Sequence, residues 1–436
     1  MKQVNIEDAA HGMVAGEDVR GADGVLVLAR GTAVDEAHLR AMRAYGVRSL
    51  SVVSDEAPPG EAGPGGPDDG TAATEARCRA LLAPRFAALD LDAPFGRTVF
   101  DLAVRRAAAR ALACGLDLDA VPAAPPHLAP PPEASLFSAR GVDPQSLVSG
   151  EVELASLPEV HVRLLDALNS DKTSAGELST IIGRDPGLAA RLLKLVNSPA
   201  YGSRAPVDTI SRAVALVGRA ELATLVMGLA AVHAFGDIDP ELCDMRAFWS
   251  HGAACGTYAA LLAAVCPGTA PDRVFVGGLL HDIGQLVILR RLPAAAGRAL
   301  LLSRIEGLSI AAAEDAVLGF DHAAVSRALL TGWHFPETLT AMAAGHHQPD
   351  GRPEARETAL VHVADILATA WAWPAFAGAT VPALSEPAWR SLGLSAAVLP
   401  GIAVAGEDRI RDTEAVFFPA QTPPQARPHP DPRKRT

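Results

Sequence analysis

One apolar run of this chain carries two adjacent polar residues that the interior of the fold has to accommodate. Residues 277–289 read GGLLHDIGQLVIL, with His281 and Asp282 at the centre of the run. A buried imidazole or carboxylate needs a partner, because an unpaired polar group is costly in apolar surroundings. Two interpretations meet this requirement: a hydrogen-bonded pair in the core, or a metal site, since imidazole and carboxylate both ligate first-row divalent ions.

Composition favours a large helical protein. The chain has 436 residues, of which 49% are hydrophobic, 20% are charged and only 5% are aromatic. This length suggests two or three domains, and abundant alanine with few aromatic residues favours helices over sheets. The net charge of −12 argues against a general nucleic-acid-binding surface. We therefore expect no nucleic-acid partner.

The sequence also predicts a cytoplasmic location. No run of about 18 apolar residues free of charges and helix breakers occurs, so we expect no membrane span. The N-terminal residues MKQVNIEDAAHG contain no apolar stretch typical of a secretory signal. The five cysteines are odd in number and form no CxxC motif, which favours free thiols in a reducing compartment over a disulfide framework.

Changes in composition divide the chain into seven parts. Short extended runs separated by glycine turns predict a small α/β unit at the N-terminus, followed by a Pro/Gly linker, a helical segment and a Pro-rich linker. A long helical domain, closing helices and a disordered tail complete the chain. The predicted parts are 1–53 (α/β domain), 54–72 (linker), 73–118 (helical segment), 119–145 (linker), 146–375 (helical domain), 376–419 (closing helices) and 420–436 (tail).

Capping residues mark several helix starts in the long helical part. A helix is expected from the Leu157-Pro158 pair through Leu168, and Ser174 is placed to cap the helix AGELSTIIG. Asp185-Pro186 has the signature of an N-cap followed by proline at the first helical position. A near-continuous apolar helix is expected over 220–234.

Several segments together resemble the HDOD family. They include LPEV at 157–160, LLKLVNSPAYG at 192–202, FVGGLLHDIGQLVIL at 275–289, GFDHAAVSRALLTGWHFP at 319–336 and HHQP at 346–349. The resemblance implies an HD-like bundle of α-helices, related to the HD metal phosphohydrolases, and a role in bacterial signal transduction or regulation. Residues 11–52 resemble the small domain that precedes some HD-type signalling proteins.

Histidine and aspartate residues recur on successive predicted helices. Adjacent residues on a helix point about 100° apart, so an HD or HH pair can reach one space between helices or serve two metals. Several helices can bring such side chains to a shared interior, as in helical di-metal proteins. The order of ligands in the HD phosphohydrolases carries over to His251, His281, Asp282, His322, His346, His347 and Asp365.

A mixed histidine and carboxylate set suits a pair of Fe, Mn, Zn or Ni ions better than Ca²⁺. The alternative is inherited helix packing without a metal, in which each histidine bonds a carbonyl or carboxylate. His334 and His362 are expected to pack or to support the cluster.

Departures from the family pattern argue against catalysis. Related phosphodiesterases usually read HDIGK, whereas Gln285 occupies the lysine position here and offers no positive charge to a phosphate. The HH pair is followed by Gln348 rather than the usual glutamate, and no GYP signature follows. If the site were active, Asp282 would be its catalytic residue.

The sequence therefore predicts an HDOD regulatory protein, either a non-catalytic scaffold or a metal- or nucleotide-binding switch. Its expected partners are signalling proteins, and a nucleotide is a candidate ligand. The alternative is a metal-dependent phosphohydrolase acting on a cyclic dinucleotide or another phosphate ester.

Overall fold

The computed structural model describes most of the chain beyond residue 68. Described residues are 69–121, 141–148, 174–197, 207–218, 242–349, 355–372 and 380–417, with parts of 2–52 and of 222–240. The helix expected over 157–168, most of the two linkers and the C-terminal tail lie outside the described residues. Of the helix expected over 220–234, only scattered positions are described, and these are helical, with Leu222, Leu225, Val226 and Leu229 buried. Among the described residues, no single helix is long and apolar enough to cross a membrane, although one bent pair, Glu386–Leu392 with Ala396–Val416, passes by length and composition.

Short strands and scattered single positions, among them the helical Leu39 and Met42, make up the described part of the N-terminal unit. β1 (Lys2–Asn5) pairs antiparallel with β4 (Ser49–Val52), and β2 (Val19–Arg20) pairs antiparallel with β3 (Leu26–Leu28). Buried side chains such as Met42 and Leu50 form a small core that also includes Val265 of the helical part. The N-terminal unit therefore packs against the rest of the protein.

A helical segment follows and joins the main bundle. α2 (Asp69–Leu82), the 3-10 helix η1 (Ala83–Phe86) and α3 (Pro94–Cys114) make up this segment. The sequence placed the start of the helical segment at residue 73, whereas α2 begins at Asp69. Trp371 of the bundle donates its Nε1–H to the carbonyl of Val99, at 3.1 Å. One continuous core runs from Cys78 to Val416, so the helical segment and the bundle fold as one body.

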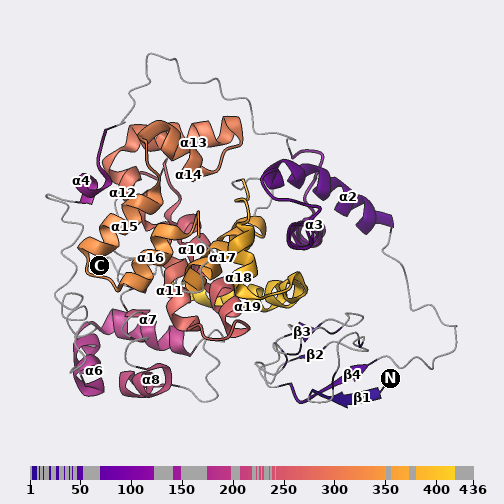
Figure 1. Ribbon diagram of the computed structural model, residues 1–436, viewed down its shortest axis with the longest axis horizontal. Coiled ribbons are helices and arrows are strands. Elements are labelled where there is room, and N and C mark those ends of the chain that lie inside the picture. The colour runs from indigo at the N-terminus through magenta and orange to yellow at the C-terminus, as the bar shows by residue number, and fades with distance from the viewer. Residues whose placement is uncertain are drawn as a thin grey trace, which may run out of the picture.

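The remaining helices pack together into a bundle (Figure 1). In chain order they are α4 (Pro144–Val148), α6 (Ala175–Gly183), α7 (Pro186–Val196), α8 (Ile210–Val217), α10 (Met245–Ala264), α11 (Pro271–Leu280), α12 (Ile283–Arg291), α13 (Pro293–Glu306), α14 (Ile310–Leu318), α15 (His322–Gly332), α16 (Glu337–Gly345), α17 (Arg356–Ala370), α18 (Glu386–Leu392), η5 (Ala396–Val398) and α19 (Leu399–Phe417). The mainly α-helical fold predicted from the sequence is confirmed.

The predicted capping residues begin their helices as expected. The Ser174 hydroxyl accepts a hydrogen bond from the backbone N–H of Glu177, whose carboxylate bonds back to Ser174 in a capping box. Asp185 accepts from the backbone N–H of Leu188 at 2.9 Å, with Pro186 at the first helical position. In Figure 1, α6, α7 and α8 lie together at one end of the bundle, and α13 and α14 lie at the other.

Glycines bring the central helices α10 and α11 into backbone contact. A Cβ atom on Gly252 would lie 2.7 Å from the carbonyl oxygen of Leu279, and one on Gly256 would lie 2.5 Å from that of Phe275. Both distances are shorter than any normal contact, so only glycine fits at these positions. His251 precedes Gly252 on α10, so this close approach helps to fix the histidine against α11.

The break between α11 and α12 is equally crowded. A Cβ atom on Gly284 would lie 2.1 Å from the carbonyl oxygen of His322 and 2.6 Å from the backbone nitrogen of Ser326, on α15. Gly284 therefore allows α15 to lie directly against the start of α12.

We expect Gly284→Ala to lower the free energy of unfolding by about 1–3 kcal/mol, because the added methyl group forces α12 and α15 apart. Urea unfolding followed by circular dichroism measures the effect. Gly297→Ala on α13 is the control, because its Cβ atom would make only an ordinary contact, 3.6 Å from Leu242. Equal stability of the Gly284→Ala variant and the parent would contradict the crowding.

Candidate metal centre

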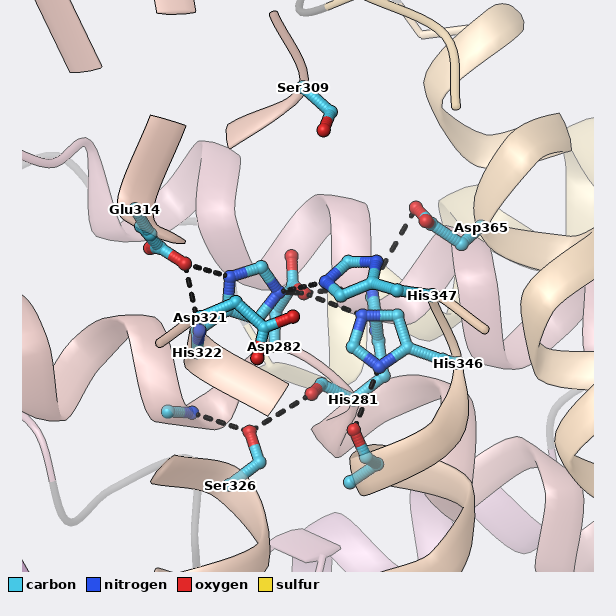
Figure 2. Close-up of polar contacts among 12 residues, drawn as sticks. His281, Asp282, Ser309, Glu314, Asp321, His322, Ser326, His346, His347 and Asp365 are labelled. Carbon is cyan, nitrogen blue, oxygen red and sulfur yellow. Dashed lines mark hydrogen bonds and ion pairs between the residues drawn. The ribbon is translucent and has the colours of Figure 1, made fainter. Parts of the chain in front are cut away.

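The His281-Asp282 pair occupies the corner between α11 and α12. α11 ends at Leu280 and α12 begins at Ile283, so the pair forms the turn between them. Ser326 of α15 holds this corner: its hydroxyl donates to the carbonyl oxygen of His281 at 3.1 Å and accepts from the backbone N–H of Gly284 at 2.9 Å. Figure 2 shows both bonds.

Two fully buried histidines present an imidazole nitrogen to the interior without a hydrogen bond. His281 Nδ1 lies 2.7 Å from the carbonyl oxygen of Gly278, and His346 Nδ1 lies 2.8 Å from that of Ala343. A carbonyl oxygen can only accept, so Nδ1 carries the proton in both rings. In the neutral imidazole the lone pair is then on Nε2, and neither buried Nε2 atom has a hydrogen-bond partner within the described structure. Burial opposes a charge on His281, yet the Asp282 carboxylate raises its pKa well above the usual value, so a metal ion would displace a proton from this ring.

The Asp282 carboxylate lies at the centre of the histidines. Its Oδ1 lies 2.9 Å from Nε2 of His322, 3.3 Å from that of His281 and 3.5 Å from that of His346. Its Oδ2 lies 3.9 Å from Nε2 of His251. One carboxylate therefore reaches four imidazoles.

Asp365 of α17 completes the cluster on the side of α10. Its Oδ1 lies 3.1 Å from Nε2 of His251 and 3.7 Å from Nε2 of His281. On the opposite side, Nε2 of His347 lies 2.9 Å from Nε2 of His322 (Figure 2).

The structure thus brings together all seven residues that the sequence selected as candidate ligands. Three subsets each place their donor atoms within 4.8 Å of one another. These subsets are His251, His281 and Asp282; His281, His346 and Asp365; and His322, His346 and His347.

Burial and mutual attraction set the charges in this cluster. Burial opposes ionisation of Asp282 and Asp365, but the neighbouring imidazoles outweigh it and hold both pKa values well below their ordinary range. Burial also opposes a charge on His322, yet the Glu314 and Asp282 carboxylates raise its pKa well above the usual value. Burial lowers the pKa of His346 and His347, so both rings are neutral at pH 7.

Glu314 of α14 is a member of the site that the sequence analysis missed. Its carboxylate oxygen Oε2 lies 2.6 Å from Nδ1 of His322 and accepts from the backbone N–H of the same residue at 2.8 Å (Figure 2). The Nδ1–H···carboxylate bond aims Nε2 of His322 at the cluster, as the supporting carboxylates of metal-binding histidines do. The one available signal was an acidic residue inside the apolar helix sequence IAAAEDAVL.

The two remaining histidines of this region lie outside the cluster. His362 is buried, and its Nδ1 lies 2.7 Å from the carbonyl oxygen of His346 while its Nε2 accepts from the backbone N–H of Ser385 at 2.9 Å. It therefore supports the HH turn rather than offering a free nitrogen. His334 is exposed, in a left-handed backbone conformation with φ of 57°.

A cavity of about 930 Å³ opens beside the cluster. Its lining includes Asp282, His322, His347, Asp365 and Gln285, the residue at the position where related phosphodiesterases carry lysine. A volume of this size accommodates a small-molecule ligand. The cluster is thus accessible to a ligand from one side.

The fold and the cluster define a class of protein: an HD-type helical bundle with a histidine and carboxylate site at its centre. Within that class, the HDOD domain family model matches residues 154–349. Residues 154–349 are thus similar to the HDOD domain family, as the sequence resemblance predicted. Six of the seven clustered residues fall inside the matched range, and Asp365 lies beyond it.

Solved structures are similar to this chain. A solved HDOD domain protein of unknown function from Geobacter sulfurreducens aligns with a TM-score of 0.51 and 24% identity, over 66% of this chain and 99% of that one. A Shewanella amazonensis protein provisionally named a phosphohydrolase aligns with a TM-score of 0.48 and 24% identity, over 61% and 97% of the two chains.

An uncharacterized protein of Treponema pallidum (strain Nichols) is 24% identical over 204 residues, 46% of this chain and 39% of that protein. The chain thus spans about two fifths of the length of this curated relative.

The pH dependence of stability tests the environment of His362. Burial lowers its pKa in the folded state, whereas the unfolded state keeps a value of about 6.5. Above pH 6.5 the ring is neutral in both states. Below that pH only the unfolded state takes up the proton, so the free energy of unfolding falls as the pH falls.

We therefore expect His362→Gln to reduce the loss of stability between pH 7 and pH 5.5 by about 1 kcal/mol. Urea unfolding at both pH values measures this difference, and the glutamine oxygen can still accept from Ser385. An unchanged pH dependence would show that His362 titrates normally in the folded protein.

Proposed function

We propose that this protein is an HDOD-type signal-transduction regulator whose bundle binds a pair of divalent metal ions and, through them, a phosphorylated ligand in the adjoining cavity. The observation that carries the proposal is the inward-facing pair of buried Nε2 atoms, on His281 and His346, in a setting with two ionised carboxylates. Without a metal, both nitrogens have the Asp282 carboxylate oxygen nearby, at 3.3 and 3.5 Å, but form no hydrogen bond to it, whereas a metal ion would use their lone pairs.

The donor set fits a metal pair. His251, His281, Asp282 and Asp365 would hold one ion, while His322, His346 and His347 would hold the other, with Asp282 within reach of both groups. Imidazole and carboxylate donors of this kind suit Fe, Mn, Zn or Ni. When bound, such ions supply Lewis acids that offset the negative charge of a phosphoryl group.

The residues around the cluster favour binding over hydrolysis. Gln285 lines the cavity and brings no positive charge to a phosphate oxygen, unlike lysine at this position. The amide of Gln285 can still donate a hydrogen bond, which orients a ligand. A bound ligand would thus lack the lysine that related phosphodiesterases place beside the phosphate, and this suits a switch.

A second candidate is a metal-dependent phosphohydrolase. The observation that favours it is the cavity, which opens directly onto Asp282, His322 and Asp365 and is large enough for a nucleotide. Asp282 would then position the reacting groups, and the cavity walls would exclude bulk water.

Metal analysis of the purified protein tests the main proposal. We expect about two divalent ions per chain and expect His281→Ala and Asp282→Asn to lose most of this metal. His334→Asn is the matched control, because His334 lies outside the cluster and asparagine tolerates its positive φ. Metal content equal to background in the parent protein refutes the proposal.

The same preparations separate the switch from the hydrolase. We expect no turnover of bis(p-nitrophenyl) phosphate or of a cyclic dinucleotide above that of the variants. Turnover that disappears in both His281→Ala and Asp282→Asn would establish the hydrolase instead.

Glu314→Gln provides a finer test of the site. Loss of the charged acceptor behind His322 should weaken metal binding by about 10–100-fold, as for other supporting carboxylates. A competition titration against a chelating dye measures the affinity. Asp315→Asn is the control, since Asp315 is the exposed neighbour of Glu314 on α14. Equal losses in the two variants would assign the effect to overall charge rather than to the bond to His322.

A further inference from the structure

Two consecutive helices form one wall of the cavity beside the cluster. α13 and α14 pack against each other as a hairpin, the α13–α14 hairpin, which spans residues 293–318. Leu300 and Arg304 of α13 and Ile310 and Asp315 of α14 line the cavity. In Figure 1 the two helices lie side by side at one end of the bundle. Access to the cluster thus depends on the position of this hairpin.

The hairpin is weakly anchored to the core along α13. Of the 14 residues of α13, only Ala296 and Ala299 are buried, and the leucines at 300–302 are half-buried. In α11, by contrast, seven of the ten residues are buried, among them Phe275 and Leu279. Alanine buries little apolar area, and regions with few buried apolar contacts open at a lower free energy than the whole protein.

Both ends of the hairpin lie at breaks in the helical backbone. Leu292, which joins α12 to α13, has φ of −131° and ψ of 53°, outside the helical region. Gly319, which follows α14, has φ of 86°, a left-handed conformation that favours glycine. Hinges use such residues at the ends of elements, because changes in a few dihedral angles there move whole helices. The hairpin can therefore swing as a unit while α12 and α15 keep their places.

A threonine from a distant part of the chain holds the tip of the hairpin. The Thr380 hydroxyl donates to the carbonyl oxygen of Gly307, at the end of α13, over 3.1 Å. Thr380 has a fixed support, because the next residue, Val381, is buried and donates its backbone N–H to the carbonyl oxygen of Arg85 at 2.8 Å. Thr380 and Arg85 also line the cavity. The bond from Thr380 thus fastens the hairpin to another wall of the cavity.

The contact between Glu314 and His322 is a second fastening of the hairpin. Glu314 is buried on α14, whereas His322 begins α15, beyond Gly319. The Glu314 carboxylate accepts from the backbone N–H of His322 at 2.8 Å and lies 2.6 Å from its Nδ1 (Figure 2). Movement of α14 away from α15 breaks both contacts and leaves the ring without its carboxylate. The position of the hairpin is therefore linked to the orientation of one ring of the cluster.

We propose that the α13–α14 hairpin is a lid over the cavity and that Glu314 couples its closure to the metal centre. In the closed lid, Glu314 aims Nε2 of His322 at the cluster, and opening removes this support while it widens the cavity. Such coupling is reciprocal, so bound metal favours the closed lid by the same factor by which closure strengthens metal binding. The coupling rests on the metal-binding role proposed above, whereas the opening of the lid does not require a metal.

Hydrogen exchange of the full chain in EDTA, followed by mass spectrometry, tests the lid. We expect the amides of α13 and α14 to exchange at similar rates, at least about tenfold faster than those of α15, because the two helices open as one unit. α14 is the informative helix, since Ala313, Val317 and Leu318 are buried, as most residues of α15 are. Fast exchange in α13 alone, with α14 as protected as α15, would overturn the lid.

Two threonine variants assign the opening to the contact at the tip. Thr380→Val should speed exchange throughout α13 and α14 by about threefold to tenfold, the effect expected from the loss of one hydrogen bond. Thr98→Val is the matched control, because it removes a hydroxyl that donates to the carbonyl oxygen of Pro94 at 2.8 Å on α3. Equal effects of the two variants on the hairpin, or an effect of Thr380→Val confined to the residues next to Gly307, would also overturn the lid.

Exchange with saturating Mn²⁺ tests the coupling, with metal content measured on the same samples. We expect bound Mn²⁺ to slow exchange of α13 and α14 by about tenfold and Glu314→Gln to abolish most of this protection, while the exposed Asp315→Asn keeps it. Mn²⁺ that binds without protecting the hairpin would overturn the coupling. Absence of bound metal would refute the metal proposal and the coupling with it, whereas exchange in EDTA decides the lid independently.

Discussion

The carboxylate of Asp282 is the group on which the centre of the bundle depends. It lies at the corner between α11 and α12 and meets imidazoles from α10, α15 and the turn after α16. The negative charge of Asp282 is tolerated at this position only because imidazoles surround it, and the carboxylate in turn stabilises positive charge on those imidazoles. The helices must therefore meet at fixed distances, which glycine and serine contacts around the corner provide.

This arrangement makes the interior polar where most helical bundles are apolar. The surrounding core is continuous and aliphatic, with Leu280, Ile283 and Leu286 buried on either side of the pair. Charges confined in such surroundings interact more strongly than in water, so binding of an ion there couples several helices at once. Such coupling suits a regulatory module, because binding of one ion at the centre of the bundle would affect several helices.

Much of this site could be predicted from the sequence. The types and the order of the histidine and aspartate residues, matched to those of the HD phosphohydrolases, selected all seven clustered residues. Histidine and aspartate side chains in apolar helices need polar partners, and a shared polar interior provides them. Local signals were equally sound for helix starts: Ser174 and Asp185 cap their helices as expected. The helix caps depend on residues close in sequence, and the cluster depends on the need of buried histidine and aspartate side chains for polar partners.

Features set by long-range packing could not be predicted. Glu314 follows three alanines on a short helix, and only the approach of α14 to the start of α15 buries its carboxylate against His322. The predicted linker at 119–145 set the helical segment apart from the bundle, and nothing in the sequence singled out Arg85. Its place in the cavity follows from the packing of the helical segment on α17, which no local pattern encodes.

The glycine contacts between α10 and α11 have a consequence for how molecules enter the protein. Where two backbones touch, there is no side-chain layer that can rearrange, so sliding these helices apart breaks many contacts together. The part of the cavity wall formed by α10 is therefore rigid. Entry and exit would then depend on the other segments that line the cavity, which include α13, α14 and the chain at Thr380 and Pro382.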